Sequence, residues 1–380
     1  MAESEDRPIR VLHLISTLDV GGAEQNLLRL LTSMEKNTFV NEVACMTAPG
    51  VMGRRMEQAG IPVHSLGMRK GSPGLGGVLR LRFMAHLYRP DIIQCWMYHA
   101  NLLGLTLAQP RRTLWNIRCS DMDLTAYGPV YRYTVRAGAR LSSIPRGVVV
   151  NSSIGRIYHE RLGYHPRQWV VIPNGFDADS FRPDPAARSA LRATLGIPGE
   201  ALVIGHVGRF DPMKDHATFF QAAREFLSLY PDARFVLAGR GVDRANPDIL
   251  KILPDGNRIN QIHLLGERQD IEKVYPSFDI FTSSSRSEGF PNAVGEAMAA
   301  GVPCVATDAG DTGALMGDTG ILVPRQSPME LCRAWQALAD LGPQLRTERG
   351  LKARERIRTC YSQDLTTRHY AALYRKIAHR

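Results

Sequence analysis

The chain has 380 residues, too many for one ordinary hydrophobic core, which predicts two domains of roughly 170 to 190 residues each. Its hydrophobic content of 44% and charged content of 22% are those of a soluble globular protein, and its formal net charge is +10. No apolar run approaches the roughly 18 residues of a membrane-spanning helix, and the polar, acidic start is unlike a signal peptide, so we expect a cytoplasmic protein. The six cysteines show no Cys-x-x-Cys spacing, which argues against a zinc site or a disulfide framework.

The positive charge is concentrated in the first half of the chain. Residues 1–175 hold 21 Lys and Arg against 12 Asp and Glu, whereas the remainder holds 26 against 25. Two windows in the first half, 58–90 and 124–159, contain no acidic residue. Basic side chains without a local carboxylate usually face an external anionic partner or simply water.

The predicted elements of the first half alternate between strands and helices. Apolar strand-like runs are expected at 9–15, 41–46, 61–65, 91–95, 113–117, 147–150 and 169–172. This alternation predicts a parallel sheet with helices on both faces, in which ligands bind at the carboxyl ends of the strands. Gly21 and Gly22 follow the first strand and open a helix, so their amides can approach an anion closely, although such a pair is commonly only a turn. Gly-x-Gly-x-x-Gly is absent after this strand, so nicotinamide binding is not indicated.

Three more polar residues follow strands of the first half. His99 comes just after 91–95 and before a helix expected from Asn101. Without context, a lone histidine in this place is about twice as often structural as functional. Arg118 and Asp121 follow 113–117, where a substrate could be contacted, and Asp121 with Asp123 is too isolated to predict a metal site.

A row of arginines is expected on one helix face, because Arg132, Arg136 and Arg140 are spaced four residues apart. A solvated helix face is the simplest interpretation, with a prior of roughly 40%. The alternative is a patch that docks on anionic lipid headgroups, each arginine contributing about 1 kcal/mol near the surface. Nucleic acid is less favoured, since no aromatic-basic RNA motif or recognition helix is present.

The second half repeats the alternation after a turn-rich junction at 172–181. Strands are expected at 202–207, 234–238, 262–265, 280–282, 303–306 and 321–323. Arg209 and Lys214 follow the first of these strands, before a helix at 217–229 that Asp215 is placed to cap. A guanidinium and an ammonium on one loop can hold two phosphates, although an ordinary exposed basic loop has the same composition.

The stretch 283–303, SSSRSEGFPNAVGEAMAAGVP, constrains the function most. It reads as a strand end, a polar loop, a short helix whose first residue is expected to be Pro291, and the start of the next strand. The first amides of this helix would seat a phosphate. Glu288 lies on the loop, whereas Glu296 lies about a turn into the helix, where vicinal ribose hydroxyls could donate to it. From spacing alone, this interpretation and that of two ordinary acidic residues have roughly even odds.

The run EGFPNAVGEAMAAGVPCVAT resembles the signature of the retaining, nucleotide-sugar-dependent glycosyltransferases of the GT-B fold, often called group 1 (family 4) glycosyltransferases. The GGAE loop at 21–24, the GR…K element at 208–214 and the junction at 172–181 are similar to the same family. The resemblance implies an α/β fold of two Rossmann-like, doubly wound domains facing a cleft. The acceptor domain would be 1–175 and the nucleotide-sugar domain 176–362, and 363–380 would form a helix that crosses back to the first domain.

The resemblance also implies roles for particular residues. Arg209 and Lys214 would offset the charge of the departing diphosphate, and Glu296 would bind the ribose. Glu288 would position the sugar, which His99 would contact. The implied donor-binding residues are Gly21, Gly22, Arg209, Lys214, Gly266, Glu288, Gly289, Phe290, Pro291, Asn292 and Glu296. The implied acceptor residues are Arg118 and Asp121. Members of the family need no metal, so no metal or other cofactor is expected beyond the nucleotide sugar itself.

We therefore expect transfer of a sugar from a nucleotide-diphosphate sugar to a glycan or lipid-linked acceptor. A GT-B-fold epimerase or phosphorylase is the enzymatic alternative, and a non-catalytic nucleotide-sugar-binding protein is the alternative of another class. The basic first half and the lipid-linked acceptors of many family members suggest peripheral contact with the inner face of the plasma membrane, through Arg132, Arg136 and Arg140.

Overall fold

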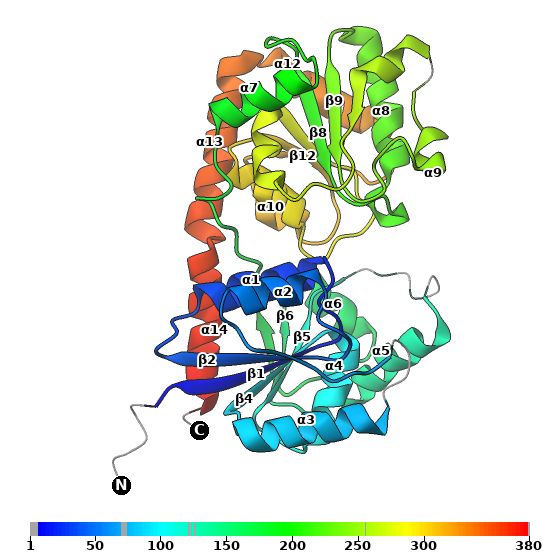
Figure 1. Ribbon diagram of the computed structural model, residues 1–380. Helices are drawn as coiled ribbons and strands as arrows, with labels where there is room; N and C mark the ends of the chain where they lie inside the picture. The colour runs from blue at the N-terminus through cyan, green and yellow to red at the C-terminus, as the bar shows by residue number, and fades with distance from the viewer. Residues whose placement is uncertain are drawn as a thin grey trace. The chain divides into compact units, whose positions relative to one another are not determined.

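The computed structural model describes residues 7–69, 74–120, 122, 124, 127–254 and 256–378. The chain forms two compact units (Figure 1). The first unit comprises the chain up to Gly175 together with the C-terminal segment from Gln363, and the second unit is Phe176–Ser362.

The first unit is built on a sheet of parallel strands, in the order β3-β2-β1-β4-β5-β6-β7. Its strands are β1 Ile9–Ile15, β2 Phe39–Cys45, β3 Val63–Ser65, β4 Ile92–Trp96, β5 Thr113–Ile117, β6 Gly147–Val150 and β7 Trp169–Val171. The order reverses between β1 and β4, where Val11 pairs with Ile92 on one side and with Asn41 of β2 on the other.

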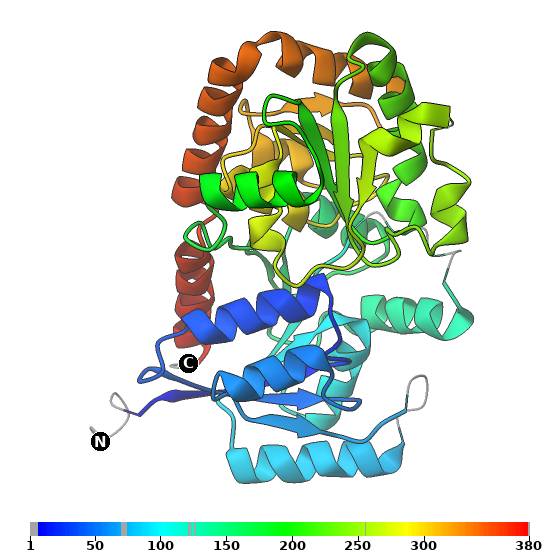
Figure 2. The ribbon, with the colours of Figure 1, turned by 45° about the horizontal axis from the view of Figure 1, so that its top comes forward.

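Helices cover both faces of this sheet. They are α1 Gly22–Ser33, α2 Val51–Gln58, α3 Leu75–Tyr88, α4 Met97–Gly104, η1 Leu105–Leu107, α5 Pro129–Leu141, α6 Ser153–Arg161 and α14 Gln363–Ala378. One core cluster joins the sheet to α1, α2 and α14, and a second joins it to α3, α4 and α5. Figures 1 and 2 accordingly show α1 and α2 on one side of the sheet and α3 on the other.

The central strands are apolar along nearly their whole length because both faces of a parallel sheet are buried. Among the buried residues of β1, the polar exception is His13, which is fully buried. Its Nδ1 accepts from Trp96 Nε1 at 3.2 Å and its Nε2 donates to Asn41 Oδ1 at 3.0 Å. This arrangement uses the neutral ring, and burial lowers the pKa of His13 to about 4.

The C-terminal helix α14 packs in the first unit through two buried tyrosines. The Tyr370 hydroxyl accepts from Asn116 Nδ2 at 2.8 Å, and the Tyr374 hydroxyl donates to Gln94 Oε1 at 3.2 Å. Both rings belong to the core cluster that contains α1 and α2. The last helix therefore completes the core of the first unit.

The second unit also contains a parallel sheet, in the order β10-β9-β8-β11-β12-β13. Its strands are β8 Val203–Val207, β9 Arg234–Ala238, β10 Ile262–Leu264, β11 Ile280–Ser283, β12 Cys304–Thr307 and β13 Ile321–Val323. Its helices are α7 Pro185–Thr194, η3 Pro212–Lys214, α8 His216–Leu229, α9 Pro247–Leu250, η4 Gly256–Gln261, η5 Ile271–Lys273, η6 Tyr275–Ser277, α10 Asn292–Ala299, α11 Thr312–Met316, α12 Pro328–Asp340 and α13 Gly342–Cys360. One core cluster contains α8 and α12, and another contains α10 and α13.

The predicted fold class agrees with this architecture, and each predicted strand is present with bounds that differ by at most two residues. Helix α4 begins at Met97 and not at Asn101 as predicted. Met97 has a φ of 69°, so the chain turns directly from β4 into the helix at a residue that carries no sequence signal for a turn. Among the described residues, no helix is long and apolar enough to cross a membrane.

Candidate functional site

The order of the second sheet reverses between β8 and β11, which lie side by side with Gly205 paired to Phe281. The loops that leave two such strands separate to opposite sides, and the crevice between them is the usual ligand site of an open parallel sheet. Lys214 follows β8, and Glu288 follows β11. The structure therefore brings these two predicted residues to one point.

Lys214 and Glu288 form a close ion pair, with Lys214 Nζ 2.5 Å from Glu288 Oε1. The same carboxylate oxygen accepts from Ser285 Oγ at 2.7 Å. The backbone is tied as well, since Ser284 Oγ donates to the carbonyl oxygen of Lys214 at 2.9 Å. The side chains of Lys214 and Glu288 are 22% and 12% exposed, so the pair is held in place but remains reachable from solvent.

Two more ion pairs surround the first. Arg209 Nε lies 2.9 Å from Asp211 Oδ2, and Arg286 Nε lies 2.9 Å from Asp215 Oδ2. Asp215 also caps α8 by accepting from the Thr218 amide, as predicted. Each of these basic side chains is already paired with a carboxylate. An anion would therefore be bound by those of their N–H groups that do not contact the carboxylate. Arg209 meets this condition, since only its Nε contacts Asp211 and half of its side chain is exposed.

Two glycines allow the strand-end loops to approach one another. Gly239, with a φ of 154°, packs against the carbonyl of Gly208, and Gly310, with a φ of 57°, packs against the carbonyl of Glu288. A Cβ at either position would overlap those backbone atoms. The close packing of Gly310 against the Glu288 carbonyl fixes the loop that carries Glu288.

Helix α10 begins at Asn292, so Pro291 is its N-cap and not its first residue as predicted. The φ of Pro291, −79°, suits a helix, but its ψ of 87° does not. No side-chain hydrogen bond caps this end, and the positive end of the helix dipole there favours an anion. Phe290 is buried and stacks on Phe176 with ring centroids 6.2 Å apart, which anchors the chain just before the helix.

Glu296 is buried in the second turn of α10, with 7% of its surface exposed. The Tyr275 hydroxyl donates to Glu296 Oε2 at 3.0 Å. The structure buries Glu296 among the residues that pack around Tyr275. The carboxylate is therefore oriented by a partner that spacing along the chain could not reveal.

Two glycines of the predicted donor set lie on loops that follow β10 and β11. Gly266 follows β10 with a φ of 67°, and its carbonyl accepts from the Gly239 amide at 2.8 Å. Gly289 continues the loop of Glu288, where its carbonyl also borders Gly310. These positions of the predicted donor set lie on loops at the carboxyl edge of the second sheet.

In the first unit, Gly21 and Gly22 lie beside the corresponding reversal between β1 and β4. Gly21 is the N-cap of α1, with extended backbone and no side-chain cap hydrogen bond. Glu24 lies in the first turn, where Thr17 Oγ1 donates to it at 3.3 Å. Burial raises the pKa of the Glu24 carboxyl.

His99 lies on the other side of that reversal, in the first turn of α4. Its Nε2 is 3.5 Å from Thr134 Oγ1, and its ring centroid is 5.9 Å from that of Tyr131, both on α5. Burial lowers the pKa of His99, so the ring favours the neutral form. The contacts with α5 show how the ring is supported, and the predicted contact with a sugar stays a prediction.

The remaining predicted residues of the first unit have varied surroundings. Arg118 donates to the Tyr370 hydroxyl at 3.2 Å and to Asn174 Oδ1, and its guanidinium lies 5.3 Å from the centre of the Trp96 ring. It thus helps to hold α14, a role that the sequence did not predict. Asp121 lies outside the described residues.

Sequence reasoning missed Ser285, Tyr275 and Arg286, which hold Glu288, Glu296 and Asp215 in place. Ser285 and Arg286 adjoin the signature, so their polar side chains beside Glu288 were an available signal. Tyr275 gave none, because it lies 21 residues before its partner on an unrelated turn.

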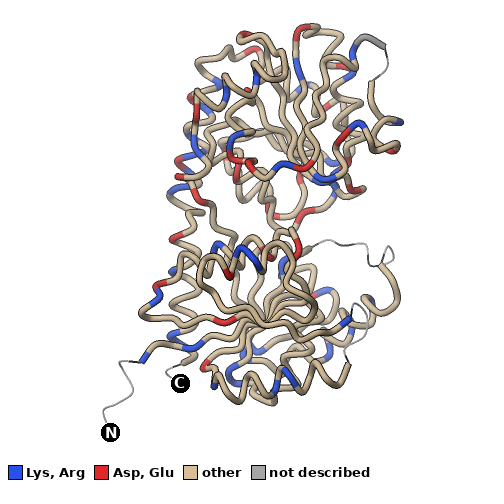
Figure 3. The backbone as a smooth tube through the Cα atoms, in the orientation of Figure 1, with Lys and Arg blue, Asp and Glu red and all other residues tan. Residues whose placement is uncertain are grey.

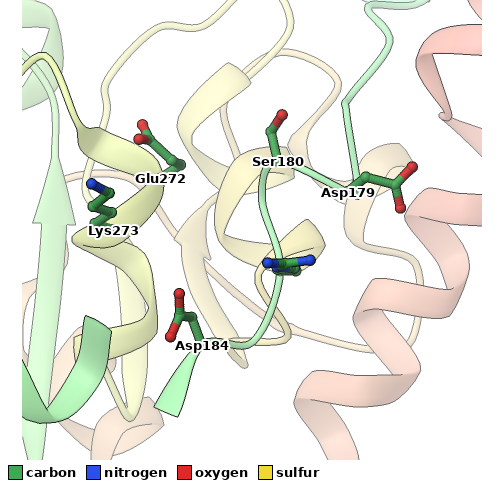
Figure 4. A pocket seen from close by; sticks show the side chains of 6 residues that line it. Asp179, Ser180, Asp184, Glu272 and Lys273 are labelled. Carbon is green, nitrogen blue, oxygen red and sulfur yellow. The ribbon is translucent and has the colours of Figure 1, made fainter. Parts of the chain in front are cut away.

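In the described part of the chain, no group of three His, Cys, Asp or Glu side chains could hold a metal ion. Figure 4 shows a surface hollow of the second unit, lined by Asp179, Ser180, Arg182, Asp184, Glu272 and Lys273. It shares no residue with the group around Lys214 and Glu288, so we do not assign the donor to it.

Two family models match the chain. "Glycosyltransferase Family 4" matches residues 20–180, and "Glycosyl transferases group 1" matches residues 201–340. The first match lies almost wholly in the first unit and the second lies in the second unit.

Curated relatives carry related names. An Escherichia coli UDP-Gal:alpha-D-GlcNAc-diphosphoundecaprenol alpha-1,3-galactosyltransferase is 30% identical over 181 residues, which cover 47% of this chain and 46% of the relative. A D-inositol 3-phosphate glycosyltransferase of Kineococcus radiotolerans is 33% identical over 213 residues, which cover 51% of this chain and 48% of the relative. The chain thus spans just under half the length of these relatives.

The fold has a counterpart among solved structures. Anabaena Alr3699/HepE, crystallised in complex with UDP, superposes with a TM-score of 0.82 at 22% identity, covering 97% of this chain and 100% of that chain. At this identity the likeness concerns the fold.

Proposed function

The chain belongs to the group 1 glycosyltransferases of the GT-B fold, and we propose that it transfers a sugar from a nucleotide-diphosphate sugar to a glycan or lipid-linked acceptor. The observation that carries the proposal is the pairing of Lys214 with Glu288 at the reversal of the second sheet. A cation held there can stabilise the departing diphosphate, and a carboxylate held there can position the sugar.

Lys214 and Arg209 act on the diphosphate in this proposal. An ammonium group has three donors, and Glu288 uses one of those of Lys214, so two remain for phosphate oxygens. Negative charge grows on the diphosphate as the glycosidic bond breaks. Both cations therefore stabilise the transition state more than the ground state, which is the condition for raising kcat.

The loop and helix after β11 hold the remainder of the donor. Glu296 accepts from ribose hydroxyls, with its orientation fixed by Tyr275. Glu288 and the backbone of Phe290–Asn292 position the sugar, and the start of α10 faces the phosphates. Gly266 lies on the loop that we assign to the base.

We assign the acceptor to the first unit, where Arg118 and Asp121 are its candidate contacts, whereas Gly21, Gly22 and His99 of that unit are assigned to the donor. A lipid-linked acceptor is supported by the name of the Escherichia coli relative, which gives a diphosphoundecaprenol substrate for that protein. Contact with an anionic membrane through Arg132, Arg136 and Arg140 fits this acceptor. Of the three, Arg136 and Arg140 are exposed on α5 and Arg132 is half-buried. The enzyme would then work at the cytoplasmic surface of the membrane.

Retention of anomeric configuration and independence from metal complete the proposal. Retention is supported by the resemblance of residues 288–307 to the signature of retaining enzymes. Independence from metal is supported by Arg209 and Lys214, which supply the positive charge that a metal would otherwise supply to neutralise a diphosphate.

A panel of nucleotide sugars tests the proposal. A donor present at 100 times its Kd should stabilise the protein by about 2.7 kcal/mol, which a thermal-shift assay detects. The donor that binds should then be turned over with a lipid-linked or glycan acceptor, and NMR of the product should show the donor's anomeric configuration. Release of an epimerised or phosphorylated sugar, without transfer, would favour the enzymatic alternative. Binding without turnover would favour a binding protein, and failure of every nucleotide sugar to bind would refute the proposal.

A further inference from the structure

Helix α3 of the first unit has two apolar faces. Its inner face packs into the core through Leu81 and Ala85, which are buried. Its outer face carries four large apolar side chains that solvent reaches: Leu75, Leu79, Phe83 and Leu87 are 84%, 66%, 65% and 64% exposed. We call these four residues the outer stripe.

The outer stripe is continuous along the helix. Its members are spaced four residues apart, so each is rotated by about 40° from the last, and the stripe runs for about 18 Å along the axis. A helix that is apolar all round is normally buried all round. None of the described elements covers this face.

Basic residues border the stripe on both sides. At about 100° per residue, Arg80 and Arg82 project roughly 80° to either side of the middle of the stripe. Both are exposed, and Arg80 Nη1 also donates to the carbonyl of Leu66 at 3.3 Å. No acidic residue occurs between positions 58 and 90, and Figure 3 shows basic residues on α3. An apolar centre with a cationic border is the pattern of a helix that lies in a membrane interface.

We propose that α3 docks on the surface of an anionic lipid bilayer, with the outer stripe among the upper acyl chains and Arg80 and Arg82 at the headgroups. The charges favour this occupant over a second copy of the chain, because a symmetric contact would bring the arginines of two α3 helices together. The area agrees, since four such side chains expose roughly 400 to 550 Å², within the range of functional patches and below the roughly 800 Å² per partner of a stable interface.

This surface is distinct from the arginines of α5, although α3 and α5 cover the same face of the first sheet. The α5 arginines would contribute long-range attraction that salt screens. The outer stripe would contribute apolar burial, which persists at high salt once the protein is at the interface. Docking by α3 does not depend on sugar transfer, so the two can fail separately.

Vesicle sedimentation with the full chain tests the proposal, using phosphatidylcholine with 30% phosphatidylglycerol and phosphatidylcholine alone. The test variant is Leu79→Gln with Phe83→Gln, which changes exposed side chains and should leave the melting temperature unchanged. The matched control is Leu229→Gln with Leu351→Gln, which are 62% and 49% exposed in the second unit. We expect the test variant to bind anionic vesicles at least tenfold more weakly and the control to bind like the wild type. A Phe83→Trp protein should show a blue-shifted emission that brominated lipids quench.

Three outcomes would overturn the proposal. The wild type could fail to bind anionic vesicles at low salt, or the test variant could bind as well as the control. Sedimentation velocity could instead show self-association of the wild type that the test variant loses, with no binding to vesicles. That last result would assign the outer stripe to a second copy of the chain.

Discussion

Replacing Glu296 with Gln tests the ribose assignment at the residue where the structure defines the surroundings most closely. The carboxylate is buried and one oxygen is held by the Tyr275 hydroxyl at 3.0 Å. A hydrogen bond to a charged acceptor contributes about 1.5 to 3 kcal/mol, so its loss should weaken nucleotide binding roughly 10- to 150-fold. The effect should appear in the dissociation constant of the free nucleotide and in the KM of the donor.

The same change should not harm the fold. Gln has nearly the shape of Glu, and its amide oxygen can still accept from Tyr275. Neutralising a buried carboxylate also removes part of the cost of its desolvation. The melting temperature of Glu296→Gln should therefore equal or exceed that of the wild type, while its affinity falls.

Isothermal titration calorimetry with UDP, or with the nucleoside diphosphate that the donor panel selects, measures the effect. Tyr275→Phe is the matched variant, because it keeps the charge and removes only the group that orients it. Its affinity should fall by a smaller factor than that of Glu296→Gln. If Glu296→Gln binds the nucleotide as tightly as the wild type, Glu296 does not contact the ribose and its buried position is only structural.

Further predictions concern the diphosphate, the metal, acid stability and the membrane. Lys214→Ala should lower kcat/KM at least a hundredfold, which corresponds to about 2.7 kcal/mol of lost transition-state stabilisation. The control Lys251→Ala, at an exposed surface ion pair, should leave kcat/KM unchanged. Equal kcat/KM values for the two variants would show that Lys214 has no part in catalysis. Excess EDTA should leave activity intact, and activity that is lost with EDTA and restored by Mg²⁺ or Mn²⁺ would contradict metal independence. His159 donates from Nδ1 to the Gly155 carbonyl at 2.7 Å and accepts at Nε2 from the Tyr98 hydroxyl at 2.6 Å, and burial lowers its pKa to about 4. The His159 ring is therefore protonated below about pH 6.5 in the unfolded chain but only below about pH 4 in the folded chain. The free energy of unfolding should consequently fall by about 2 kcal/mol between pH 7 and pH 5 from this histidine alone. Urea midpoints at the two pH values, with an NMR titration of the ring, check this, and a ring that protonates near pH 6.5 would contradict it. Arg132→Glu with Arg136→Glu should reduce binding to anionic vesicles at low salt, and unchanged binding would mean that this face of α5 is only solvated.

The strands could be predicted from the sequence because both faces of each parallel sheet are buried, so that a strand appears as a short apolar run between polar turns. The ion pairs could not be predicted in the same way. Lys214 and Glu288 are 74 residues apart, and only the adjacency of β8 and β11 brings them together. Their conjunction was inferred from a family resemblance and not from spacing.

Two other features show the same limit. Arg118 has the residue type and the place of a substrate contact, yet one of its hydrogen bonds goes to Tyr370 of α14, which is 252 residues away. In α3, apolar residues occur on every side, so periodicity could not tell which face is buried. The outer stripe became visible only when the packing of Leu81 fixed the inner face.

The position of α14 has a consequence for the order in which the protein matures on the ribosome. Residues 176–362 are synthesised before α14, although α14 belongs to the first unit. Until then the first unit lacks Tyr370 and Tyr374, and the buried groups of Asn116 and Gln94 lack their hydroxyl partners. The second unit has no such dependence, since its residues are contiguous. Of the two units, the one that is begun first is therefore the last to be completed, and its nascent sheet has to stay soluble while the other folds.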